Sequence, residues 1–470
     1  MNRDIHKQRV KITPLNQPTG GVYRPDSFPN IEFMLAKNNA FLDPRTLRLN
    51  ATFQYYNGSG TIPNADGSEN PNNVPNTKIG GATNGAAINN SIGVKSVFDE
   101  MSIGTLVGRN LETIRSANRY IAASRPFLHS SMELNNGVGL EDPTVTNKSV
   151  SNATTCNTAF SISIDVPLGM FESQKYINMS DKGFAGLTLN LLLAPNNVVL
   201  QPFFNYNETK NPVAFTSTTP FIYTLRDVNL TYDLLIPSDK LYNSLPSSGV
   251  INYQTVNTLH SSLLSSDQTI PIKLGSNAVV SITHSMIPSI HLNNIKRDSF
   301  LLDEPRDNAT TTTDGVRKPI KEVQYLRAGV LFPYDYFLNS EAQLDLNGSV
   351  PGVAETVQAQ IMKPAQNSVS LYDNFNNKFN PNTNIGLLTN LGNAGGFSQS
   401  QVKTSAADPK QTFLLGFPTD STRLGVSYKD REYAIRIQSE LNNTSVNSFM
   451  TFSRFRQVAQ FSPAGLNIIG

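Results

Sequence analysis

Three scarcities limit what this 470-residue chain can be: it has one cysteine, no tryptophan and few charged residues. The single cysteine, Cys156, excludes any disulfide within the chain, so the fold does not depend on an oxidising compartment. Its polar surroundings, TTCNT, favour an incidental thiol over a catalytic nucleophile. Charged residues make up 16% of the sequence and the net charge is +2, so no overall attraction to nucleic acid is expected.

Long hydrophobic runs are also missing. No stretch of about 18 apolar residues occurs, and the sequence therefore predicts no transmembrane helix. The first ten residues, MNRDIHKQRV, contain no apolar core of a signal peptide, so we expect a protein that is not secreted. The glycosylation sequences at Asn50, Asn178, Asn229 and Asn443 are then expected to carry no glycan.

Motifs that carry chemistry are absent as well. The chain has no Gly-x-Ser-x-Gly elbow, no Walker loop and no His-Glu-x-x-His sequence. Of its five histidines only His284 and His291 lie near each other, and their spacing does not fit a zinc site. We therefore predict that the protein is not an enzyme, and that it has no catalytic residue, metal site, cofactor or small-molecule substrate.

Alternation of apolar and polar residues is what the chain has in abundance. Leu47, Leu49, Ala51 and Phe53 alternate with polar residues, as half-buried β-strands do. Further alternating runs cover 31–35, 160–168, 187–193 and 221–235, and a second series covers 251–259, 268–274, 278–283, 323–332, 411–416, 433–441, 449–455 and 466–469. The sequence therefore predicts an all-β protein.

The length of the chain suits two β-sandwiches better than one. Pro237, after the run that ends at Leu235, is the best boundary between them. We predict an N-terminal arm over 1–25, a first sandwich over 26–237 and a second over 238–470. Short helices are expected over 94–101, 111–121 and 353–361. Long loops are expected over 57–92, 133–158, 195–220, 303–318 and 364–410, where Asn, Gly, Ser, Thr and Pro are frequent.

Basic residues gather in the N-terminal arm, at Arg3, Lys7, Arg9 and Lys11. Two interpretations stay open from the sequence. The arm could be a frayed, solvated tail, or it could touch an anionic partner such as a genome or a lipid surface.

Four segments, taken in order, resemble the double jelly-roll major capsid proteins of icosahedral DNA viruses, in particular those of Polinton-like viruses, adintoviruses and virophages. The segments are FLDPRTLRLNATFQYY (41–56), the helix–strand–helix pattern of 94–123 with Gly108, Leu111 and Glu112, the strand pair of 160–197, and VQYLRAGVLFPYDY (323–336). Each pattern is common alone, and their order over nearly the whole chain carries the resemblance.

The resemblance implies two tandem eight-stranded jelly rolls, which are β-sandwiches with helices and loops inserted. It implies a structural virion protein that forms homotrimers, and these pseudo-hexameric capsomers would tile an icosahedral shell. Its partners would be itself, neighbouring capsomers, penton and minor capsid proteins, and through the basic arm an inner membrane or genome. It would be assembled inside the host cell and located in the virion.

A second hypothesis also fits two β-sandwiches: an attachment or carbohydrate-binding protein, which would need exposed aromatic side chains. A third, a carbohydrate-active enzyme on a jelly roll, would need a pair of carboxylates in a cleft.

Overall fold

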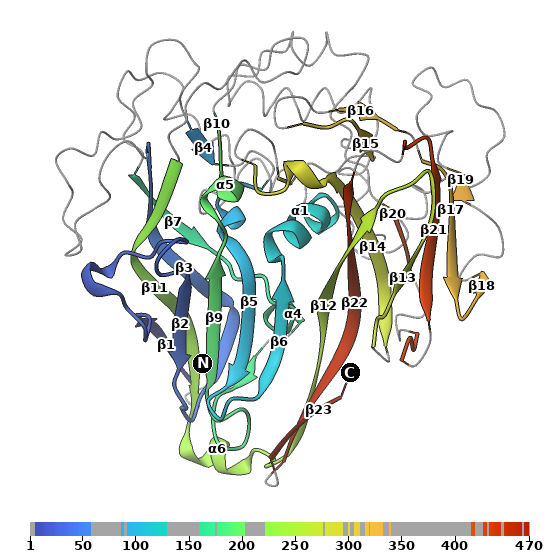
Figure 1. Ribbon diagram of the computed structural model, residues 1–470. Coiled ribbons are helices and arrows are strands. Elements are labelled where there is room, and N and C mark those ends of the chain that lie inside the picture. The colour runs from blue at the N-terminus through green and yellow to red at the C-terminus, as the bar shows by residue number, and fades with distance from the viewer. Residues whose placement is uncertain are drawn as a thin grey trace.

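Antiparallel β-sheets make up most of the computed structural model of the chain (Figure 1). The residues that the structure describes are 5–57, 86–88, 92–128, 159–173, 176–202, 221–275, 278–294, 299–300, 305–310, 315–318, 320–331, 338–339, 415–418, 426–429, 432–442, 446–462 and 465–469. The all-β prediction is confirmed.

The first sandwich has two main sheets, with strand orders β1-β11-β3-β7 and β2-β9-β5-β6. The strands of the first sheet are β1 (Ile5–Ile12), β3 (Phe41–Asn57), β7 (Ala159–Ile164) and β11 (Phe221–Pro237). Those of the second are β2 (Asn30–Leu35), β5 (Phe98–Thr105), β6 (Asn110–Arg115) and β9 (Leu187–Leu193). Three short strands join them: β8 (Ile177–Asn178) beside β3, and the pair β4 (Ala86–Ile88) and β10 (Leu200–Pro202).

The second sandwich repeats the plan, with orders β12-β22-β14-β20 and β13-β21-β17-β18. Its first sheet contains β12 (Gly249–Leu263), β14 (Val279–Pro288), β20 (Leu415–Pro418) and β22 (Asn447–Ser462). Its second contains β13 (Asp267–Ile272), β17 (Ile320–Arg327), β18 (Val330–Leu331) and β21 (Tyr433–Ser439). Short additions are β23 (Gly465–Ile469), β19 (Leu338–Asn339), and the pair β15 (Arg306–Asp307) and β16 (Val316–Arg317).

The two sandwiches have the same topology. When the eight main strands of each are ranked in chain order, both have the sheet orders 1-8-3-6 and 2-7-4-5. Two four-stranded sheets connected in this way form a jelly roll. The chain is thus two tandem eight-stranded jelly rolls, as predicted, and no main sheet that the structure describes contains strands from both sides of Pro237.

The alternation in the sequence places each jelly roll's core between its two sheets. On β3, Leu49 and Phe53 are fully buried, whereas Arg48 and Asn50 on the opposite face are partly exposed. Phe53 also stacks on Tyr223 of β11, with ring centroids 5.4 Å apart. Full burial of a side chain of this size stabilises the fold by about 1.5–3 kcal/mol, so reversing the alternation of even one long strand would be costly.

The helices predicted over 94–101 and 111–121 are wrong in part. A 3₁₀ helix covers only Gly93–Val97, and β5 begins at Phe98. Leu111 lies on β6, and α1 (Ala117–Leu128) begins after Ser116, whose φ of +49° turns the chain. Short apolar runs fit a helical period and a strand about equally well, and here sheet pairing decided between them.

Other helices are short. They are α4 (Gly169–Ser173), α5 (Asn196–Val199), α6 (Asp239–Ser244) and the 3₁₀ turns Thr19–Gly21 and Ser289–His291. The helix predicted over 353–361 and most of the predicted long loops lie outside the described residues.

His284 joins the two sheets of the second jelly roll. It is completely buried on β14, with Nδ1 2.8 Å from the Thr451 hydroxyl and Nε2 3.0 Å from the Tyr433 hydroxyl. Its ring stacks on Phe449, with centroids 4.8 Å apart. Burial lowers the pKa of His284 to about 3, so the imidazole is neutral in the folded protein at ordinary pH. Its role is structural, in agreement with the absence of a zinc pattern in the sequence.

We predict that His284→Ala lowers the free energy of unfolding by about 2–4 kcal/mol, because it leaves a cavity and removes the hydrogen bonds of the imidazole to Thr451 and Tyr433. The unfolded state binds a proton near the ordinary pKa of 6.5 and the folded state only near 3, so His284 makes wild type lose stability as the pH falls between these values. Urea unfolding at several pH values should show this slope reduced in the variant. The exposed His6→Ala is the control, and an equal slope in wild type and His284→Ala would contradict the prediction.

Candidate functional site

The N-terminal segment is a strand in the structure. β1 pairs antiparallel with β11 along its whole length, from Ile5 opposite Pro237 to Ile12 opposite Leu230, and forms the edge of its sheet. Val10 and Ile12 pack against the core of the first jelly roll, while Lys7, Arg9 and Lys11 are exposed. The interpretation as a frayed tail is therefore wrong for residues 5–12, because the apolar residues on one face of this short strand give it a place in the sheet.

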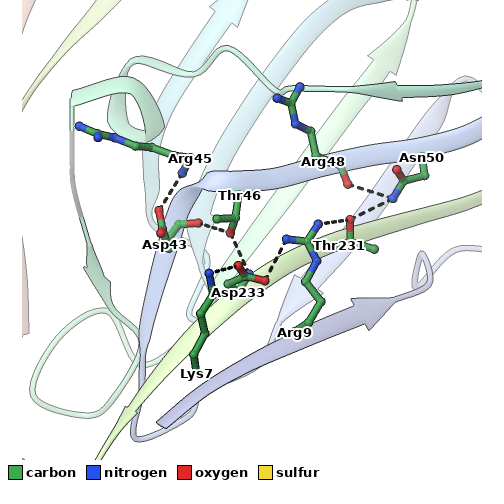
Figure 2. Close-up of polar contacts among 9 residues, drawn as sticks. All are labelled: Lys7, Arg9, Asp43, Arg45, Thr46, Arg48, Asn50, Thr231 and Asp233. Carbon is green, nitrogen blue, oxygen red and sulfur yellow. Dashed lines mark hydrogen bonds and ion pairs between the residues drawn. The ribbon is translucent and has the colours of Figure 1, made fainter. Parts of the chain in front are cut away.

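Asp233 on β11 holds two of the predicted arm residues (Figure 2). Lys7 Nζ lies 2.7 Å from Oδ2 and Arg9 Nη1 lies 2.9 Å from Oδ1. The Asp233 side chain is only 6% exposed, because the two cations cover it. Both partners come from the outward face of β1, as two-residue spacing on a strand requires.

The same polar cluster reaches a third strand. Thr46 on β3 accepts a hydrogen bond from the Asp233 backbone N–H and donates one to the Asp43 carbonyl, each 2.8 Å long. Arg9 Nη2 donates to the Thr231 hydroxyl, to which Asn50 also donates. Figure 2 shows these side chains on the outer face of the sheet, so β1, β11 and β3 are tied together there by polar contacts.

The charge of Asp233 follows from these contacts. Burial favours the neutral carboxyl, but the hydrogen bonds and charges of Lys7 and Arg9 outweigh it and keep the pKa of Asp233 below its ordinary value. The hydrogen bond to Asp233 likewise raises the pKa of Lys7. Asp233 is thus ionised near neutral pH and fixes the start of the chain to the sheet.

The structure brings together two of the four basic residues singled out in the sequence. Lys7 and Arg9 meet on Asp233, Lys11 lies further along the same face opposite Thr231, and Arg3 lies outside the described residues. Asp233 itself was missed. In the sequence Asp233 is one carboxylate on the polar side of an alternating strand. Its role cannot be predicted until the neighbouring strand β1 is known.

We predict that Asp233→Asn loosens β1. Exposed ion pairs contribute about 0.2–1 kcal/mol each, so backbone amides of residues 5–12 should exchange roughly 3–10 times faster in the variant at pH 7. The contribution of Asp233 is present above the ordinary pKa of 3.8 and is lost as the pH falls below it, so the two proteins should converge in acid. Asp267→Asn, which removes the Arg436 pair of the second jelly roll, should leave residues 5–12 unchanged. Equal protection in wild type and Asp233→Asn at pH 7 would contradict the prediction.

A second polar cluster joins the two jelly rolls. The edge strand β6 of the first lies beside β12 of the second (Figure 1). The Tyr253 hydroxyl donates to the Leu111 carbonyl over 2.6 Å, and the Thr258 hydroxyl donates to the Arg115 carbonyl over 2.7 Å. Carbonyl groups on a sheet edge otherwise accept hydrogen bonds from water or from another strand. Here the hydroxyl groups of the second jelly roll donate these hydrogen bonds to the edge strand of the first.

Glu112 lies at the centre of this junction. Its side-chain oxygens accept hydrogen bonds from the backbone N–H groups of Gly169 and Met170 at the start of α4, both 2.9 Å long. A Cβ atom on Gly169 would lie 1.6 Å from the Gln254 carbonyl oxygen of β12. Only glycine therefore allows the backbones of α4 and β12 to approach so closely.

Burial controls the charge of Glu112, which is 3% exposed. Loss of hydration raises its pKa to about 7, although the hydrogen bonds from the two backbone N–H groups partly oppose the change. The junction thus holds a carboxyl group that is about half protonated near neutral pH.

We predict that Glu112→Gln changes how stability depends on pH. The folded-state pKa is raised, so the contribution of Glu112 is complete below the unfolded value of 4.5 and is lost as the pH rises through about 7. This loss amounts to about 3 kcal/mol for such a shift. Urea unfolding between pH 4.5 and 7.5 should show wild type losing stability relative to Glu112→Gln. Glu100→Gln, at a more exposed carboxylate, is the control, and parallel curves for wild type and Glu112→Gln would contradict the assignment.

The described residues contain no group of three or more His, Cys, Asp or Glu side chains that could hold a metal ion. Among the same residues, no helix has the length and apolar character needed to cross a membrane. The polar clusters described above consist of hydrogen bonds and ion pairs between strands and between the two jelly rolls.

Comparison with known proteins supports the fold. No protein-family model matches the chain, and no curated protein matches it in sequence. A chain from the cryo-EM structure of the Sputnik virophage is similar with a TM-score of 0.54 and 10% identity, over 99% of this chain and 88% of that one. The Faustovirus major capsid protein is similar with a TM-score of 0.50 and 8% identity, over 97% of this chain and 91% of that one. The similarity thus extends over both jelly rolls and agrees with the double jelly-roll fold expected from the sequence.

Proposed function

We propose that the protein is a major capsid protein, a structural component of a virion and not an enzyme. The observation that carries the proposal is the architecture: two jelly rolls of the same topology follow one another in one chain and dock through β6 and β12. The Faustovirus major capsid protein has a similar fold over nearly its whole length. Two rigid β-sandwiches joined in one chain suit a structural subunit that must form the same contacts in many copies.

The proposed mechanism is assembly. Three copies would form a homotrimer in which six similar jelly rolls surround one axis, giving a pseudo-hexameric capsomer, and neighbouring capsomers would tile an icosahedral shell. Penton and minor capsid proteins would complete the shell, which would be assembled inside the host cell. The boundary between the jelly rolls would lie at Pro237, because β11 ends there and the strands of the second topology begin at Gly249.

The N-terminal segment has a proposed role at the inner surface of the shell. Residues 1–25 would form the arm, with Arg3, Lys7, Arg9 and Lys11 facing an inner membrane or the genome. The strand β1 attaches this arm to the sheet, because Lys7 and Arg9 form ion pairs with Asp233. Since Asp233 offsets part of their charge, the arm would attract anions only modestly.

The alternative is a two-domain attachment or carbohydrate-binding protein. It would need a ligand site with exposed aromatic side chains. In the described residues, aromatic side chains such as Phe53 and Tyr223 fill the cores, and the large aromatic side chains that are exposed are Phe28 and Tyr176, which lie on different segments. This distribution favours the structural role.

We predict that the purified protein forms trimers and that a subset of these associates further at high concentration. Light scattering after size-exclusion chromatography measures the trimer, and negative-stain images should show pseudo-hexagonal particles. A strictly monomeric protein at high concentration, with binding on a glycan array, would contradict the capsid proposal and favour the attachment protein. Replacing Arg3 and Lys11 by glutamine tests the arm separately, because β1 then keeps its place in the sheet. Unchanged shell formation and unchanged contents of the shell would contradict the proposed role.

A further inference from the structure

The linker between the two jelly rolls, residues 238–248, contains a helix that is too short to be stable by itself. α6 (Asp239–Ser244) has six residues, and none of them is buried. Helices shorter than about 12 residues are marginal in water unless other parts of the protein stabilise them. Since burial does not stabilise α6, the contacts at its two ends have to do so.

The first end of α6 is capped within the linker. The Ser238 hydroxyl accepts a hydrogen bond from the Leu241 backbone N–H over 3.4 Å. Asp239 lies in the first turn, where a negative charge favours the helix. A hydrogen bond of this length is weak, so the cap alone does not offset the cost of forming so short a helix.

The last turn of α6 is bound by Lys182, which belongs to the first jelly roll. Its ammonium group donates hydrogen bonds to the backbone carbonyls of Tyr242, Asn243 and Leu245 over 3.0, 3.3 and 3.1 Å. It also lies over the Tyr242 ring, 4.9 Å from the centroid. The last carbonyls of a helix lack partners within the helix and form its negative end. Lys182 therefore directs its charge and its three donors at groups that favour a cation.

The turn between β8 and β9, which carries Lys182, has a fixed backbone. The Asn178 side-chain oxygen accepts hydrogen bonds from the N–H and the hydroxyl of Ser180, 3.0 and 2.7 Å long. The Asn178 carbonyl accepts one from the Phe184 N–H, 3.0 Å long. A Cβ atom on Gly183 would lie 2.4 Å from the same carbonyl oxygen, so only glycine permits this approach. Lys182 thus reaches α6 from a backbone whose course is set within the first jelly roll.

The same turn also contacts the second jelly roll. Phe184 is 4% exposed, and its ring centroid lies 5.9 Å from that of Phe461 on β22. Phe461 pairs with Gly249, the first residue of β12, where a Cβ atom would lie 2.4 Å from the Phe461 ring. Lys182 and Phe184 of one turn therefore contact the helix of the linker and the strand pair that follows the linker.

We infer that the turn between β8 and β9 is a clasp, in which Lys182 binds the linker to the first jelly roll and keeps it ordered. A segment between two domains is ordinarily the place where they move relative to one another. Here the clasp removes that freedom, because α6 is fixed to one jelly roll and the next strand pair contacts the same turn. The inference goes beyond the proposed capsid function and does not depend on it.

The test replaces Lys182 by methionine in the full-length protein, which keeps an unbranched side chain and removes the charge and the donors. The backbone N–H groups of Tyr242 and Leu245 donate hydrogen bonds within the linker. We expect these amides to exchange with solvent roughly tenfold faster in Lys182→Met, and subtilisin to cleave the linker correspondingly sooner. The melting temperature should change little, because the contacts of β6 and α4 with β12 remain.

Two further variants make the test specific. Lys37→Met is the matched control, because Lys37 is exposed and pairs over 2.6 Å with Asp181, the residue before Lys182. It should leave the linker as protected as in wild type. Lys182→Arg keeps a cation, and its linker should exchange at a rate between those of wild type and Lys182→Met. Equal linker exchange in wild type and Lys182→Met would overturn the inference, as would equal effects of Lys182→Met and Lys37→Met or faster exchange spread evenly over both jelly rolls.

Discussion

The arrangement of this molecule depends on one constraint: the backbone groups at the edge of a sheet need hydrogen-bond partners. The edge carbonyls of β6 at Leu111 and Arg115 accept hydrogen bonds from hydroxyl groups of β12. Glu112 on the same strand binds the start of α4, and Gly169 lets α4 touch the backbone of β12. Because these contacts use both backbone and side chains, the two jelly rolls are joined in one orientation and not merely linked.

The two jelly rolls share one strand order, so each strand of one can be compared with the corresponding strand of the other. Two units with the same strand order are joined by a contact between unlike surfaces, β6 of the first and β12 of the second. Away from this contact, Lys7, Arg9 and Lys11 are exposed on β1, and Val330 is exposed on β18. One fold is thus used twice in the chain, with different residues on corresponding strands.

The carboxyl groups of Glu112 and Asp233 show how environment decides the role of one chemical group. Asp233 lies beneath two cations at the rim of the sheet, and its pKa lies below its ordinary value. Glu112 is buried at the junction between the jelly rolls, where it accepts hydrogen bonds from two backbone N–H groups, and its pKa rises to about 7. Asp233 is thus ionised at neutral pH and holds the N-terminal strand, whereas Glu112 titrates near neutral pH at the contact between the jelly rolls.

The sequence by itself determined the all-β class, most of the long strands and the division into two similar blocks, because strict alternation along 47–55 or 228–234 permits one buried face only. It misassigned Phe98 and Leu111 to helices, because short apolar runs satisfy both periods. Only the tertiary structure decided that Lys7 and Arg9 meet Asp233 and that Glu112 meets α4. These partners are far apart in the chain, and no local pattern encodes a contact that exists only after the strands have paired.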